Sequence, residues 1–92
     1  MGEAIVRPPS EEAWEKAISG DTADSVKAIL ERLHQSPGKG VSVEELVKLD
    51  PTFGPERANA INNMLRMRKL PFRLVPTRRT PWEKQKIALA AI

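Results

Sequence analysis

The stretch PERANAINNMLRMRKLPFRLV, residues 55–75, decides the fold that this sequence predicts. Its first two thirds favour a helix, because Ala58, Ile61 and Leu65 recur at the i, i+3, i+4 spacing of a buried helix face. Residues 72–75 then combine apolar side chains with one arginine over a length typical of a short strand. We therefore predict a helix that leads directly into a strand.

The opposite face of this helix carries amide and basic side chains and no acidic one. The residues of this stripe are Asn59, Asn62, Asn63, Arg66 and Lys69. Asparagine can pair with adenine and arginine with guanine in a major groove, so the stripe indicates a nucleic-acid recognition surface. The alternative is that these are solvated residues on a helix held only by its packing, since asparagine is a poor helix former.

The residues before this stretch predict further short elements. They are a helix over 10–19, a helix from 21 or 22 to 35, one or two residues of strand at 41–42, and a helix over 43–49. Ser10 and Ser42 are suited to cap the first and last of these helices, while Pro37, Gly38 and Gly40 interrupt the chain between elements. A short helix, a turn and a longer polar-faced helix is the order of a winged helix-turn-helix domain. The predicted fold class is mainly α with a small β component.

The C-terminal part leaves two alternatives open. Thr80 and Glu83 have capping-box spacing, Pro81 suits a first helical position, and residues 87–92 are rich in Ala, so we favour a terminal helix over a returning strand. We divide the single domain into a flexible lead at 1–9, a winged-helix domain with an extra N-terminal helix at 10–81, and the helix or strand at 82–92.

Basic charge is concentrated in the last part of the chain. The 92 residues carry a net charge of +3, but residues 56–92 contain nine basic and two acidic side chains, whereas residues 1–35 contain four and seven. This segregation is the electrostatic signature of a protein that binds a polyanion. Arg73 in the strand, and Arg78 and Arg79 in the turn after it, are added to the stripe as candidate phosphate contacts. The alternative for the two turn arginines is a solvated loop.

The composition argues against catalysis and metal binding. The chain has no cysteine, which excludes disulfides, thiolate metal sites and a cysteine nucleophile. The one histidine, His34, lies at a predicted helix end with no pattern that orders a nucleophile and base around it. Gly38 and Gly40 lack the spacing of a phosphate-binding loop. We predict no enzyme activity, no cofactor and no metal.

No apolar run approaches the length of about 18 residues that spans a bilayer, and no leader pattern opens the chain. We therefore expect a soluble, intracellular protein with no membrane partner. Apolar residues at the two ends of the chain suggest a second kind of partner, a protein subunit. The candidates for that contact are Trp14, Trp82, Ile87 and Leu89.

Two groups of residues carry a family resemblance that covers residues 29–74. They are Leu33, His34, Gln35, Pro37 and Gly40, followed by Glu56, Arg57, Ala58, Ala60, Ile61, Asn62, Leu65, Met67 and Leu70. In order and spacing the sequence resembles the first winged-helix domain of the TFIIE-related initiation subunit of RNA polymerase III. It departs from that family in lacking a second winged-helix domain and in residues 76–92, which are unlike the family's wing. A fainter similarity links Asn62 or Asn63, together with Pro81 and Trp82, to domains that bind Z-form nucleic acid.

The resemblance implies a module of a transcription assembly that acts without catalysis. Its expected partners are double-stranded DNA and other subunits of the transcription complex, and its expected location is the nucleus; without the resemblance we expect the cytoplasm. The alternative function is a winged helix that acts as a scaffold through protein contacts alone, because the same fold serves both purposes.

Overall fold

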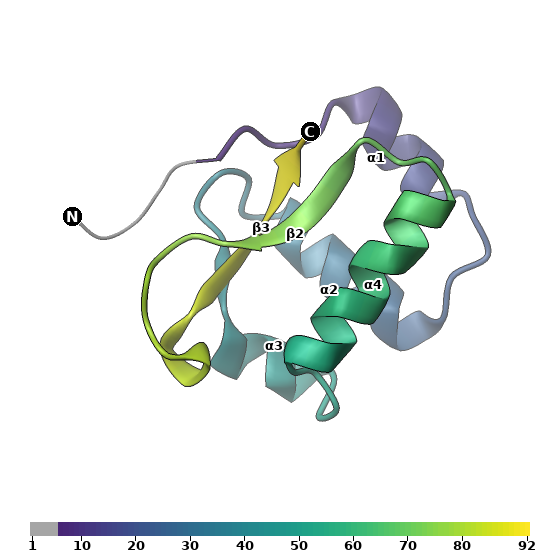
Figure 1. Ribbon diagram of the computed structural model, residues 1–92. Coiled ribbons are helices and arrows are strands. Elements are labelled where there is room, and N and C mark those ends of the chain that lie inside the picture. The colour runs from purple at the N-terminus through teal and green to yellow at the C-terminus, as the bar shows by residue number, and fades with distance from the viewer. Residues whose placement is uncertain (1–5) are drawn as a thin grey trace.

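The computed structural model describes residues 6–92, which fold into helices packed on a small antiparallel sheet (Figure 1). The elements within this range are α1 (Glu11–Ile18), α2 (Asp24–His34), β1 (Val41–Ser42), α3 (Val43–Leu49), α4 (Pro55–Met67), β2 (Phe72–Pro76), the short 3-10 helix η1 (Trp82–Lys84) and β3 (Lys86–Ala91). The strand order is β1-β3-β2, with both pairs antiparallel. The predicted combination of several helices with a small β component is confirmed.

Local signals placed most helix ends correctly. The Ser10 hydroxyl accepts a hydrogen bond from the Ala13 amide at 3.1 Å, and the Ser42 hydroxyl accepts one from the Glu45 amide at 3.2 Å. Both serines are therefore N-caps, as predicted. The second helix begins later than predicted, at Asp24 and not at residue 21 or 22, and its N-cap provides no side-chain hydrogen bond.

The C-terminal segment is a strand, so our preference for a terminal helix was wrong. Trp82–Lys84 form only a single 3-10 turn, and β3 then pairs with β1 on one side and β2 on the other. Leu74 lies opposite Leu89 in the β2–β3 register, and Leu89 is buried in the core. Alanine favours helices by less than 1 kcal/mol per residue over most others. Backbone pairing along both edges of a central strand outweighs that preference.

The core lies between the sheet and the helices. The buried aliphatic and aromatic side chains come from α1, α2, α3, α4 and all three strands and form one cluster. Ile29, Leu46 and Leu65 are fully buried at its centre. Helix α2 packs against β3, and α4 packs against β2, which fixes α4 at the side of the sheet (Figure 1).

Strand β1 pairs only with the first two residues of β3. Residues 6 and 7 lie beside the later part of that same edge of β3. The Val6 amide donates a hydrogen bond to the Gly38 carbonyl at 3.4 Å, and the Ala91 amide donates one to the Arg7 carbonyl at 2.7 Å. This part of the predicted flexible lead is thus hydrogen-bonded to the domain. The remainder of the lead, residues 1–5, lies outside the described residues.

Candidate nucleic-acid interface

Helix α4 has one side on the core and one side that no other element covers (Figure 1). Ile61 and Leu65 point into the core and are 2% and 0% exposed. The exposed side, which we call the α4 outer face, consists of Glu56, Asn59, Ala60, Asn63, Arg66 and Met67. Three of the five predicted stripe residues therefore lie on one accessible surface. Met67 is 76% exposed, a feature that the sequence analysis did not predict.

Asn62 is not part of this face. Its side-chain nitrogen donates to the Leu74 carbonyl at 3.0 Å, and its side-chain oxygen accepts from the Leu74 amide at 2.8 Å. Both ends of the side-chain amide are thus bonded to the backbone of Leu74, which joins α4 to β2 and turns the amide toward the strand. The prediction that Asn62 reads bases conflicts with this geometry. Asn63, its neighbour in sequence, is exposed.

Lys69 ends α4 in an unusual backbone conformation. Its φ is +59°, the only positive φ of a non-glycine residue within residues 6–92. The Lys69 amide donates to the Arg66 carbonyl at 3.0 Å, and the Leu70 amide donates to the Leu65 carbonyl at 2.9 Å. This is the Schellman pattern of helix termination, in which the left-handed position usually holds glycine. The Lys69 side chain is exposed just beyond the α4 outer face.

The three predicted phosphate-binding arginines differ in their exposure and in the hydrogen bonds that their side chains make within the protein. One Arg73 nitrogen donates to the Leu70 and Phe72 carbonyls, both at 2.7 Å. Arg78 is half-buried and donates to the Lys84 carbonyl at 3.3 Å, within the loop that joins β2 to β3. Arg79 alone among the three is exposed. It is the best placed of them to reach a phosphate.

Gln85 organises this loop and was missed by the sequence analysis. It is 8% exposed, and its side-chain nitrogen donates to the Arg78 carbonyl at 2.6 Å and the Thr80 carbonyl at 2.8 Å. These bonds hold the loop backbone against the start of β3. The sequence around Gln85 does not indicate this role. The Arg78 and Thr80 carbonyls come close to its side chain only because the loop folds back on the start of β3.

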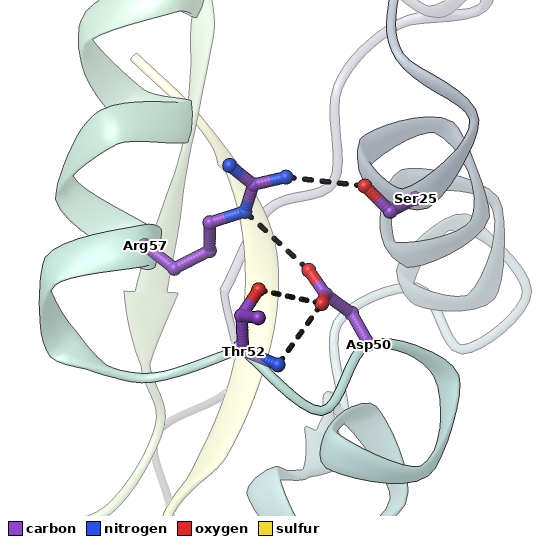
Figure 2. A network of polar contacts seen from close by, with 4 residues as sticks. All are labelled: Ser25, Asp50, Thr52 and Arg57. Atoms are coloured by element: carbon purple, nitrogen blue, oxygen red, sulfur yellow. Dashed lines mark hydrogen bonds and ion pairs between the residues drawn. The ribbon is translucent and has the colours of Figure 1, made fainter.

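A polar network joins the end of α3, the turn after it, α4 and α2 (Figure 2). The Asp50 carboxylate, 5% exposed, accepts from the Thr52 hydroxyl at 2.7 Å and the Thr52 amide at 3.0 Å. Arg57, in the first turn of α4, donates to the same carboxylate at 3.4 Å and to the Ser25 hydroxyl of α2 at 3.1 Å. The Thr52 hydroxyl, with further help from the Thr52 amide and Arg57, holds the pKa of Asp50 below its usual range against the opposing effect of burial. The turn is thereby tied to two helices.

Arg68 connects the other end of α4 to the N-terminal helix. Its guanidinium donates to the Thr22 hydroxyl at 2.9 Å and to the Lys16 and Ala17 carbonyls at 3.3 and 3.4 Å. The last two are carbonyls near the C-terminus of α1, which have no acceptor role inside the helix. A Cβ at Gly20 would lie 1.5 Å from an Arg68 nitrogen, so Gly20 provides the space for this contact. Arg68 is therefore structural.

The prediction of a partner-binding surface fails for three of its four residues. Trp14, Ile87 and Leu89 are 7%, 2% and 3% exposed and belong to the core. A partner cannot reach side chains that the fold buries, so these three are packing residues. Trp82 alone remains half-buried at the surface. Its ring lies 5.7 Å from that of Phe53, at a tilt of 30°.

The described residues contain no arrangement typical of a metal site or a membrane span. His34 stacks on Trp14, with ring centroids 4.1 Å apart and planes within 5°. No group of three or more His, Cys, Asp or Glu side chains within residues 6–92 is placed to hold a metal ion. No helix in the same range is long and apolar enough to cross a bilayer.

Comparison with known proteins adds no relative. No family model matches this sequence, and neither a curated protein nor a solved structure matches it.

Proposed function

We propose that this chain is a winged helix-turn-helix domain that binds double-stranded DNA, with α4 as its recognition helix. In this proposal β2, β3 and the loop between them form the wing. The order α2-β1-α3-α4-β2-β3 and the β1-β3-β2 sheet support the proposal, since they match the arrangement that such a domain requires. On the resemblance to the RNA polymerase III initiation subunit, we further propose that the domain belongs to a transcription assembly.

One observation carries the proposal: Asn59, Asn63 and Arg66 are exposed together on the α4 outer face. Their side chains make no hydrogen bond or ion pair with another residue in the described range. Asparagine and arginine are the side chains that pair bidentately with adenine and guanine. A helix of 13 residues that stands clear of the core along one side suits entry into a major groove.

Lys69 supports the same assignment through its backbone. A left-handed conformation costs a non-glycine residue about 1–2 kcal/mol. Strain of this kind tends to persist at functional sites. A lysine at the end of the recognition helix would contact the phosphate backbone, which requires positive charge more than a fixed geometry.

Titration of labelled duplex and single-stranded DNA at two salt concentrations tests this function. We expect salt-sensitive binding that favours the duplex, and weaker binding for Arg66→Ala. The matched control is Lys16→Ala, which removes one positive charge from exposed α1 and should leave binding unchanged. Absence of duplex binding at low salt, in a protein shown to be folded, would contradict the proposal. If Arg66→Ala and Lys16→Ala weaken DNA binding equally, the binding depends on overall charge and not on the α4 outer face.

A further inference from the structure

A second surface feature lies between α3 and η1, which pack against each other. It is a groove of about 280 Å³, lined by Val43, Glu44, Val47, Trp82 and Glu83. Val43 and Val47 are one turn apart on α3 and form one apolar wall. Trp82 forms the other wall, and its contact with the buried Phe53 ring holds the indole in place.

The groove combines apolar walls with an acidic rim. Glu44 on α3 and Glu83 on η1 are both exposed, so a carboxylate stands on each side of the opening. Glu83 is one of only two acidic residues in the basic part of the chain, residues 56–92. The rim would repel a phosphate, which separates this groove chemically from the α4 outer face.

The size of the groove limits its occupant. Small-molecule pockets usually enclose roughly 300–1,000 Å³, so about 280 Å³ suits a single long side chain better than a cofactor. An arginine has an apolar stem that packs on aliphatic and aromatic surfaces and a charged end that remains near water. Its planar guanidinium also stacks on indole rings and pairs with carboxylates in a fork geometry.

We propose that the groove binds an arginine side chain presented by a partner protein. The stem lies between Val43, Val47 and the face of Trp82, and the guanidinium is held by Glu44 and Glu83. The groove lies on α3 and η1, and its two carboxylates would not attract a polyanion, so we expect the arginine contact to form without the α4 outer face, although η1 belongs to the same loop as Arg79. It gives the domain one face for a polyanion and another for a basic protein segment.

A capped Ala-Arg-Ala peptide, titrated into the isotopically labelled protein, tests the proposal by nuclear magnetic resonance. We expect a saturable shift of the Trp82 indole N–H signal and of the Val43 and Val47 methyl signals. The Trp14 indole is an internal control, because it is buried against His34 and should not move. The same peptide with citrulline in place of arginine keeps the shape without the charge, and it should bind up to about five-fold more weakly for each ion pair lost.

A matched pair of double variants completes the test. Glu44→Gln with Glu83→Gln should weaken the arginine peptide several-fold while leaving the fold intact, since both residues are exposed. Glu11→Gln with Glu15→Gln removes the same charge from exposed positions of α1 and should leave binding of the arginine peptide unchanged. Equal binding of the citrulline peptide, an unshifted Trp82 signal, or insensitivity to the rim variant would each overturn the proposal. Displacement of the peptide by duplex DNA would also overturn it, because the groove would then belong to the nucleic-acid surface.

Discussion

The amide of Asn62 gives Leu74 the two hydrogen bonds that a neighbouring strand would otherwise provide. Strand β2 is an edge strand, paired with β3 on one side only, and an exposed edge invites pairing with other chains. Asn62 satisfies the free amide and carbonyl of Leu74 from α4, and Pro76 at the strand end has no amide to offer. The residue therefore protects the edge and also fixes the position of α4.

Replacing Asn62 should cost stability, whereas replacing Asn63 should cost DNA binding. Asn62→Ala leaves two backbone groups of Leu74 without their partner, and we expect a loss of about 1–3 kcal/mol in the free energy of unfolding, measured with urea. Asn63→Ala changes an exposed side chain and should stay within about 0.5 kcal/mol of the wild type. Equal stability of the two variants would show that the Asn62 bonds contribute nothing net.

Lys69→Gly should separate stability from function. Glycine removes the strain at φ +59° at the cost of a more flexible unfolded chain, so we expect unfolding free energy that is unchanged or raised by up to about 1 kcal/mol. Binding to duplex DNA should nevertheless weaken, because the proposed contact between Lys69 and phosphate is lost. Lys69→Ala is the control that removes the charge and keeps the strain. Undiminished binding by both variants would exclude Lys69 from the interface.

At the scale of elements, the α3–α4 turn depends on a buried charge whose partners lie closer to the surface. Asp50 connects the end of α3 to Thr52 in the turn, and Arg57 extends the network to α2 (Figure 2). This network ties the start of α4 to α2 and to the end of α3. It also makes this junction sensitive to protonation of a single carboxylate, because Asp50 accepts the bonds from both Thr52 and Arg57.

The stability of the domain should fall in acid through Asp50. Its pKa in the folded protein lies below the unfolded value of about 3.9, so the stabilisation is complete above that value and disappears as pH falls through the folded pKa. Urea unfolding as a function of pH should show this loss in the wild type and a shallower slope in Asp50→Asn. That variant should also lose about 1–3 kcal/mol at neutral pH.

Two further variants test whether the loss of stability in acid arises from the hydrogen bonds that Asp50 accepts. Thr52→Val removes the hydroxyl donor that lies 2.7 Å from the Asp50 carboxylate, so the free energy of unfolding should fall less steeply in acid than in the wild type. Ser25→Ala removes a bond to Arg57 and none to Asp50, so it should leave the slope close to that of the wild type. A wild-type slope in Asp50→Asn would mean that another group controls the acid response.

The elements show which predictions a sequence supports. Helix α3 was predicted with its observed bounds because Ser42 and the residues around Pro51 act locally. Strand β3 was not, because its composition favours a helix and its two pairing partners are distant in sequence. The outward direction of Asn59, Asn63 and Arg66 followed from helical periodicity. The hydrogen bonds of Asn62 depend on the position of β2 relative to α4, and helical periodicity alone does not predict that position.

At the scale of the whole molecule, part of the basic charge of residues 56–92 has a structural use. Arg57 pairs with Asp50, Arg68 holds the end of α1, and Arg73 donates to backbone carbonyls. The total of nine basic residues therefore overstates the charge available to a ligand. The exposed cations at or near α4 and in the loop after β2 are Arg66, Lys69, Arg79 and Lys84, of which the first three belong to the proposed interface.

This distinction predicts the salt dependence of DNA binding. If these three cations contact phosphates, log K should fall with log salt concentration with a slope of about −3, because each neutralised phosphate contributes about 0.9. Arg79→Ala should reduce the steepness by about one, whereas Asn63→Ala should lower affinity for a preferred sequence and leave the slope unchanged. Arg73→Ala should act mainly on stability. A slope near −8 would instead require all nine basic residues at the DNA, and Arg57, Arg68 and Arg73 would then have to give up their present hydrogen bonds on binding.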